Sequence, residues 1–158
     1  MKIVVCIKQV PDTAEVKLDP KTNTLIREGV PSIINHDDKA GLETALHIRE
    51  QVGGTETVAC MGPPQVNVAL REALAMGADE AYLLSAREFG GSDTYATATI
   101  IATALRKIGF DLVITGRQAI DGDTAQVGPQ IAEQLHIPQV SYAEELKVEG
   151  DSVIVKRQ

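Results

Sequence analysis

The stretch Asp111–Leu135, DLVITGRQAIDGDTAQVGPQIAEQL, has the pattern of a strand, a glycine-rich loop and a helix. Its start, DLVIT, is a short, mostly β-branched run, which is typical of a strand buried on both faces. The loop Gly116–Pro129 follows, and Gln130–Leu135 is a good helix-forming sequence. Backbone N–H groups at the start of such a helix favour a phosphate or a carboxylate. The loop therefore predicts either a phosphate site or a plain glycine-rich connection, and it matches neither GxGxxG nor a P-loop.

The composition indicates one globular domain spanning residues 1–158, with a core large enough to fold. Aromatic residues make up 3% of the chain and Trp is absent, so the core must consist mainly of Val, Ile, Leu and Ala. So few rings argue against a platform for stacking nucleic-acid bases. The net charge of -7 also argues against binding a phosphate backbone.

The N-terminal run MKIVVCIKQV is too short to be a signal peptide or a membrane span, so we expect a cytoplasmic protein without membrane insertion. Cys6 and Cys60 each lie in an apolar, strand-like run, which predicts buried free thiols and no metal site. The three histidines lack metal-ligand spacing, and no Ser/His/Asp or Cys/His arrangement is evident. The sequence thus carries no self-contained catalytic set.

Strand and helix patterns alternate along the chain. Apolar runs predict strands at residues 2–7, 55–61, 80–84 and 111–115, and helical patterns follow at about 36–52, 66–76, 94–107 and 130–135. This order predicts an α/β fold with a doubly wound, mainly parallel sheet and helices on both faces. Ligands of such sheets bind at the carboxyl ends of the strands, near a switch in strand order. The loops after Ile7, Met61, Leu84 and Thr115 should therefore converge.

Two shorter patterns lie outside this alternation. Val16–Asp19 and Thr24–Arg27 are expected to pair as a small hairpin insertion near residues 16–27. Val153–Val155 has the pattern of a strand close to the last residue, Gln158. A strand at that point leads us to expect that the native chain continues.

Three polar groups in the converging loops each have more than one interpretation. Lys8 suits either a phosphate partner or a solvated lysine at a strand end. Asp93 and the threonines after it suit either a diphosphate contact or simple capping of the next helix. Asp121 and Asp123 flank Gly122, so they suit paired acids, ribose contacts or Asx turns that shape the loop.

Six segments resemble the β subunit of electron transfer flavoproteins, and together they cover nearly the whole chain. The segments are CIKQVPDT (Cys6–Thr13), NHDDKAGLETA (Asn35–Ala45), MGPPQ (Met61–Gln65), LREALAMGADEAYLL (Leu70–Leu84), GGSDTYATA (Gly90–Ala98) and GRQAIDGDTAQVGPQIAE (Gly116–Glu133). The resemblance implies an adenine-nucleotide-binding fold, shared with universal-stress proteins, and a heterodimer with an α subunit that carries FAD. It also implies a C-terminal arm beyond Gln158.

The resemblance leaves two versions of the nucleotide site. Conventional members hold AMP, whereas electron-bifurcating members of anaerobic bacteria hold a second FAD. The bifurcating type accepts a hydride from NADH and sends one electron to ferredoxin or flavodoxin. The other electron reaches an acyl-CoA dehydrogenase through the α-subunit FAD. Small residues at Gly90, Gly91, Thr94 and Thr97 leave room for the diphosphate and flavin of FAD, so we favour FAD, with AMP as the alternative.

The resemblance assigns cofactor contacts to matching positions of this chain. Backbone at Cys6 and Met61 should contact the adenine and ribose, Asp93 and its neighbours the diphosphate, and the loop the phosphates. The expected cofactor-binding residues are Cys6, Asn35, Met61, Asp93, Thr94, Thr97, Gly116, Gln118, Asp121, Gly122, Asp123, Thr124, Ala125, Gln126, Val127 and Gly128.

Two functions from other classes remain as alternatives. A standalone ATP- or AMP-binding module of the universal-stress type would share this sheet and its ligand edge. An adenylating enzyme would need a PP-loop after the first strand, and Lys8–Pro11 does not provide one.

Overall fold

The computed structural model describes residues 1–12, 17–18, 21, 25–26 and 31–158. Four parallel strands form its central sheet in the order β7-β6-β1-β8: β1 (Lys2–Ile7), β6 (Thr55–Met61), β7 (Glu80–Leu84) and β8 (Leu112–Thr115). The chain runs outward from β1 through β6 to β7, then crosses back to place β8 on the other side of β1. The switch in strand order therefore lies between β1 and β8.

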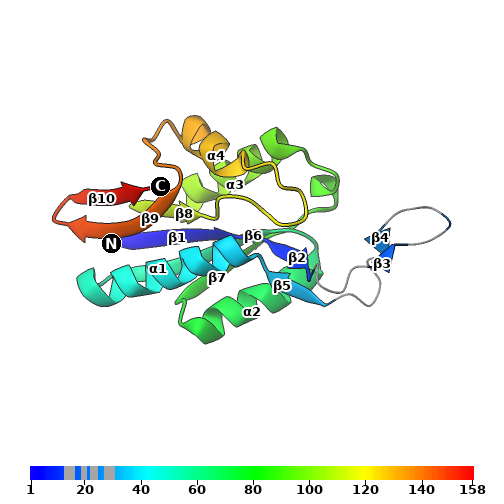
Figure 1. Ribbon diagram of the computed structural model, residues 1–158, viewed down its shortest axis with the longest axis horizontal. Coiled ribbons are helices and arrows are strands. Elements are labelled where there is room, and N and C mark those ends of the chain that lie inside the picture. Colours follow the sequence, from blue (N-terminus) through cyan, green and yellow to red (C-terminus); the bar gives the residue numbers. More distant parts are fainter. Residues whose placement is uncertain (13–16, 19–20, 22–24, 27–30) are drawn as a thin grey trace.

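Helices cover both faces of this sheet (Figure 1). One face carries α1 (His36–Val52) and α2 (Asn67–Met76), which pack on Ile3, Val5 and Val58 in one buried cluster. The other face carries α3 (Thr94–Ile108) and α4 (Val127–Leu135), which pack on Val4 and Ala59 in a second cluster. The predicted doubly wound α/β fold is confirmed.

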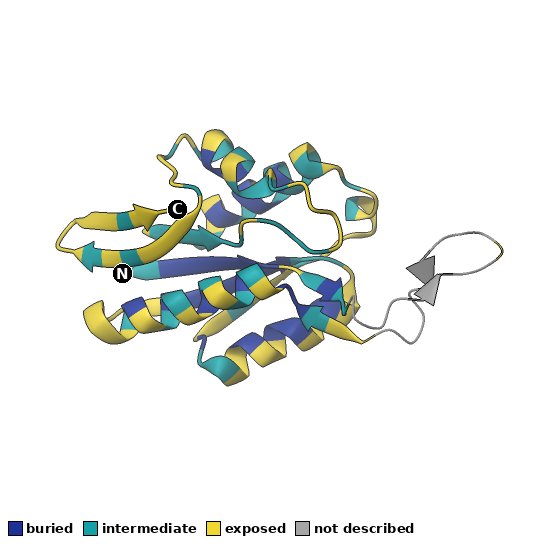
Figure 2. Cartoon of the chain, in the orientation of Figure 1, coloured by how far each residue is buried: buried dark blue, intermediate teal, exposed yellow. Residues whose placement is uncertain are grey.

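The burial of β1 explains why its apolar run is continuous. Ile3, Val4 and Val5 are each 0% exposed, and alternate side chains enter the two core clusters on opposite faces. Figure 2 shows β1 as a buried strand between helices whose outer sides are exposed. The strand at the centre of the sheet is thus fixed by packing from both layers.

A short antiparallel pair brings the chain back to the end of β1. In this pair β2 (Gln9–Pro11) runs beside β5 (Ser32–Ile34). The Asn35 N–H then donates to the Lys8 carbonyl at 2.9 Å, so α1 starts directly beside the carboxyl end of β1. Between β2 and β5, the described residues of the expected hairpin pair as β3 (Lys17–Leu18) and β4 (Leu25–Ile26). The rest of that expected hairpin lies outside the described residues.

The C-terminal region forms an antiparallel hairpin of β9 (Ala143–Glu149) and β10 (Ser152–Arg157). The predicted strand at Val153–Val155 is confirmed as part of β10, whereas its partner β9 was not predicted. Leu146 and Val148 of β9 pack against the core cluster beneath α1. Within the described ranges, the remaining elements are two 3-10 turns, η2 (Pro64–Val66) and η3 (Arg87–Phe89).

Candidate functional site

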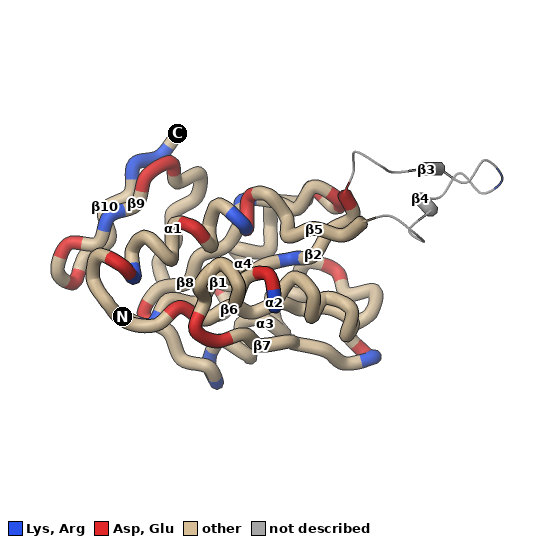
Figure 3. Tube along the Cα trace, turned by 90° about the horizontal axis from the view of Figure 1, so that it is seen from below, with Lys and Arg blue, Asp and Glu red and all other residues tan. Residues whose placement is uncertain are grey.

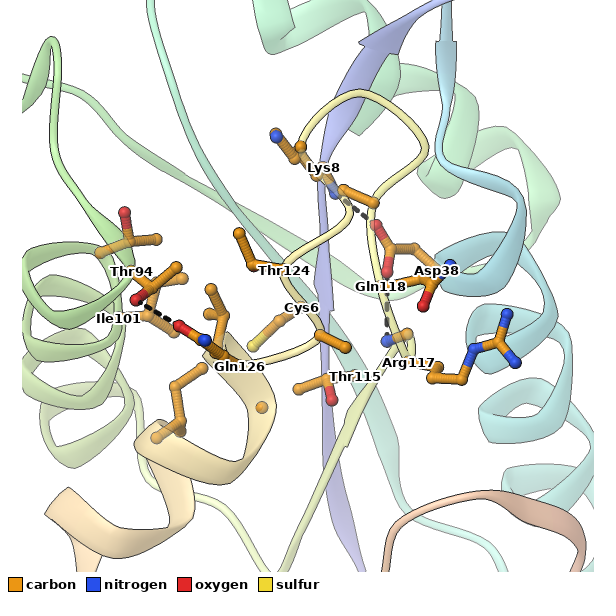
Figure 4. Close-up of a pocket in the computed structure, with 18 of the residues that line it drawn as sticks. Cys6, Lys8, Asp38, Thr94, Ile101, Thr115, Arg117, Gln118, Thr124 and Gln126 are labelled. Carbon is orange, nitrogen blue, oxygen red and sulfur yellow. Dashed lines mark hydrogen bonds between the residues drawn. The ribbon is translucent and has the colours of Figure 1, made fainter. Parts of the chain in front are cut away.

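A cavity of about 550 Å³ opens at the carboxyl ends of β1 and β8, at the switch in strand order. Its volume lies in the range typical of cofactor pockets. Figure 4 shows the loop after β8 passing over the end of β1, with α3 and α4 on one side and the start of α1 on the other. The lining residues are Cys6, Ile7, Lys8, Asp38, Met61, Ser92, Asp93, Thr94, Thr97, Ile101, Thr115, Gly116, Arg117, Gln118, Ala119, Gly122, Asp123, Thr124, Ala125, Gln126, Val127, Gly128 and Ile131.

Asn35 fixes the middle of the loop after β8. Its side chain is fully buried, and its Nδ2 donates to the Gln118 carbonyl at 2.8 Å. Its Oδ1 accepts from the Ile120 N–H at 3.1 Å. An amide that donates to one backbone group and accepts from another satisfies both of its polar ends inside the protein. Asn35 therefore fixes the backbone of the loop at Gln118 and Ile120 from the α1 side.

Asp38, in the first turn of α1, joins the ends of the two neighbouring strands. One carboxylate oxygen accepts from the Lys8 N–H after β1 at 2.8 Å, and the other accepts from the Gly116 N–H after β8 at 3.1 Å. The side chain is 7% exposed. Burial raises the pKa of Asp38 to about 6, although hydrogen bonds from Lys8, Asn35 and Gly116 oppose the shift. A Cβ at Gly116 would collide with this carboxylate, which explains the glycine.

Lys8 closes the outer side of the loop. Its ammonium lies 2.7 Å and 2.9 Å from the two carboxylate oxygens of Asp121. Lys8 is partly exposed, in agreement with a solvated lysine at a strand end, and it pairs with Asp121; a phosphate contact by Lys8 stays a prediction. Asp121 is likewise occupied in holding the loop, in agreement with the loop-shaping role and not with the paired-acid role.

The loop approaches α4 through a strained backbone. Asp123 and Ala125 have φ values of 52° and 53°, in the left-handed region that non-glycine residues rarely adopt. α4 then begins at Val127, so Val127–Pro129 form its first turn and not the end of the loop as predicted. Pro129 is tolerated there because first-turn N–H groups have no intrahelical partner. The free N–H groups of that turn border the cavity and suit an anionic ligand.

The start of α3 forms the opposite wall. Asp93 is the N-cap, and its carboxylate accepts from the Ala96 N–H at 2.8 Å, which confirms the capping interpretation. The Thr94 hydroxyl donates to Gln126 at 3.1 Å, so this wall is tied to the end of the loop. Thr97 lies one turn further along α3 and also lines the cavity.

Cys6 and Cys60 are buried free thiols, as predicted. Burial raises the pKa of Cys6 to about 12 and that of Cys60 to about 11, with Asp38 adding to both shifts. Cys6 borders the cavity, but a thiol with so high a pKa stays protonated near neutral pH. It therefore offers apolar packing and not a nucleophile.

The structure gathers the residues that the sequence assigned to a cofactor around one cavity. All of them line it except Asn35 and Asp121, which hold the loop through Gln118, Ile120 and Lys8. Sequence reasoning missed Asp38, which entered only as part of the segment NHDDKAGLETA. In the sequence, the one signal for the position of Asp38 is that an acid follows Asn35 by three residues.

Charged residues of both signs are dispersed around the trace (Figure 3), with no basic stripe among the residues described. Within the same described ranges, no helix is long and apolar enough to cross a membrane.

Residues 22–158 match the family model described as "Electron transfer flavoprotein domain". The chain belongs to the electron transfer flavoprotein family. It is 68% identical over 157 residues to "Electron transfer flavoprotein subunit beta" of Thermoanaerobacterium thermosaccharolyticum, covering 99% of this chain and 60% of the relative. This agrees with the resemblance to the β subunit.

Two further relatives of this electron transfer flavoprotein chain have names that mention reductases. It is 61% identical over 160 residues to "Caffeyl-CoA reductase-Etf complex subunit CarD" of Acetobacterium woodii, covering 100% of this chain and 61% of the relative. It is 54% identical over 161 residues to "Acryloyl-CoA reductase electron transfer subunit gamma" of Anaerotignum propionicum, covering 99% and 60%. The chain thus spans about three fifths of the length of the curated relatives it matches.

Proposed function

We propose that this chain is the nucleotide-binding part of an electron transfer flavoprotein β subunit and that its cavity holds FAD. The chemistry that FAD supplies in such a site is acceptance of a hydride from NADH and release of the two electrons singly. One electron would pass to ferredoxin or flavodoxin. The other would pass through the FAD of an α subunit to an acyl-CoA dehydrogenase.

The observation that carries this proposal is the extent of the cavity. It reaches from Lys8 and Gly116 at the strand ends to Thr94 and Thr97 on α3. The adenine and ribose of AMP need only part of this space. The hydroxyls and N–H groups of α3 and the first turn of α4 suit the diphosphate of a longer nucleotide. The names of the relatives support a place in reductase complexes.

The residues of the chain have defined tasks in this proposal. The first turn of α4 would bind phosphate oxygens through backbone N–H groups, and Thr97 would add a hydroxyl. Asn35, Asp38 and the Lys8–Asp121 pair would hold the loop in a shape that receives the ligand. Cys6 and Ile101 would provide apolar contacts that exclude water.

The test is to denature the intact protein and identify the released nucleotides by mass spectrometry. FAD from this site, in addition to any α-subunit FAD, supports the bifurcating type. AMP in its place points to the conventional type and refutes the FAD proposal. The family assignment favours both over a standalone universal-stress module.

A pair of threonine variants sharpens the test. Thr97→Val removes a hydroxyl from the cavity wall at nearly constant volume, and we expect weaker FAD retention and slower flavin reduction by NADH. Thr103→Val is the matched control, because Thr103 lies on the same helix, is exposed and donates to the Thr99 carbonyl. Equal FAD retention in the two variants would contradict a ligand contact by Thr97.

A further inference from the structure

We propose that Asp38 is the positioning residue of this nucleotide site: its ionised carboxylate holds the loops after β1 and β8 in the arrangement that binds the ligand. The inference rests on the proposed nucleotide-binding function and adds a residue to it. It concerns a residue that acts through two backbone segments and does not require contact with the ligand.

The geometry places Asp38 where two strands that are distant in sequence become neighbours. β1 and β8 lie side by side, and the residues that follow them, Lys8 and Gly116, each donate a backbone N–H to a separate oxygen of this carboxylate. Both N–H groups need an acceptor, and a carboxylate offers two equivalent ones. A protonated acid or an amide offers one acceptor and turns a donor toward the other N–H. Charge on Asp38 is therefore what lets both loops be held at once.

The surroundings explain why this ionisation matters at accessible pH. Besides the hydrogen-bonding groups, the neighbours of Asp38 are Asp37 on its own helix, Cys6 on β1 and Cys60 on β6. Asp37 disfavours the charge on Asp38. Asp37 itself pairs with Arg117 on the loop after β8, where the guanidinium lies 3.7 Å from the Asp37 carboxylate. Beyond these, the ammonium of Lys8 is turned to Asp121. Burial dominates and raises the pKa of Asp38 to about 6.

This arrangement predicts that ligand affinity declines when the medium is acidified. With a pKa of about 6, about one tenth of the molecules keep Asp38 ionised at pH 5, and apparent affinity scales with that competent fraction. The dissociation constant should therefore rise about tenfold between pH 7.5 and pH 5. The opposite slope is expected if Asp38 merely repels an anionic ligand, because protonation would then strengthen binding.

The experiment measures FAD binding to the full-length protein in its native assembly, after removal of bound nucleotide, from pH 5 to 8. FAD is a suitable probe because its phosphates are diesters that keep their charge over this range. We expect the wild type to lose about tenfold in affinity on acidification. Asp38→Asn should bind weakly at every pH and show little slope. Asp37→Asn, a change of the same kind on the adjacent, more exposed residue, should still lose affinity on acidification, with the midpoint displaced to lower pH because Asp37 no longer disfavours the charge on Asp38.

Other outcomes separate the two proposals. If the wild type binds adenosine but not FAD, the FAD proposal fails, and the same pH series with adenosine tests Asp38. A flat or reversed wild-type profile with either probe overturns the positioning role, even if Asp38→Asn fails to fold. If Asp38 only stabilised the fold, Asp38→Asn would lower the midpoint temperature of unfolding, while the molecules that remain folded would show the wild-type dependence of FAD affinity on pH. Binding of neither probe would overturn both proposals.

Discussion

The opposite end of the sheet from the cavity carries a buried acid without a partner. Glu56, the second residue of β6, is 0% exposed, and neither carboxylate oxygen has a hydrogen-bond partner among the described residues. Its backbone is paired with Asp79, whose carboxylate also meets Arg49 at 2.8 Å. Burial raises the pKa of Glu56 to about 7; Arg49 opposes the shift and Asp79 adds to it.

This shift makes stability depend on pH in a defined direction. Between the ordinary pKa of 4.5 and about 7, the folded state binds more protons than the unfolded state. The stabilising contribution is thus fully present below the unfolded pKa and is lost as pH rises through the folded pKa. From these two values, Glu56 should lower the free energy of unfolding by about 2 kcal/mol between pH 5.5 and pH 8.

Glu56→Gln tests this at nearly constant shape, because Gln resembles the protonated acid. We expect the stability of the variant relative to the wild type to increase by about 2 kcal/mol between pH 5.5 and pH 8, measured by urea unfolding, and the two to match only below the unfolded pKa of Glu56. Comparing variant with wild type at each pH cancels the titration of all other groups. Glu50→Gln, on an exposed side chain of α1, should show no such pH-dependent gain. A gain independent of pH, or a loss at pH 8, would refute the reasoning.

Three further predictions concern the loop. Gly116→Ala should destabilise the fold by about 1–3 kcal/mol, because its Cβ would collide with Asp38; urea unfolding would measure it. Asn35→Ala should cost a similar amount, about 1–3 kcal/mol, and speed amide exchange at residues 118–120, since two loop groups lose their partner. Lys8→Met should cost less than about 1 kcal/mol, because its pair with Asp121 is partly exposed, but should hasten nucleotide release in stopped-flow measurements.

The framework of the fold could be predicted because its signals are local. The strands at residues 2–7, 55–61 and 80–84 have the predicted bounds, since continuous apolar runs end at Gly, Pro or polar residues. The helices followed from apolar spacing and from caps such as Asp93. β9 was missed because AEELKVE is mostly charged and only Leu146 and Val148 face the core. Its strand character comes from pairing with β10, which no local pattern records.

The location of the site could be predicted, but the side-chain contacts that hold its loops could not. Loops that leave parallel strands must converge, so the gathering of the loops after Ile7, Met61, Leu84 and Thr115 followed from topology, whereas Cys6 and Met61 themselves were assigned by the resemblance. The contacts that shape it join residues far apart in sequence: Asp38 to Gly116, Asn35 to Ile120 and Lys8 to Asp121. Spacing along the chain carries no information about such pairs.

The order of the strands explains why the first turn of α1 has this role. β1 and β8 are neighbours without being consecutive, so no short connection ties the loops that follow them. The β2–β5 pair returns the chain to the end of β1, and α1 therefore begins within reach of both loops. Asn35 and Asp38, on one side of that first turn, then hold the Gly116–Gln126 loop from beneath. The shape of the candidate nucleotide site is thus set largely by residues outside the glycine-rich loop.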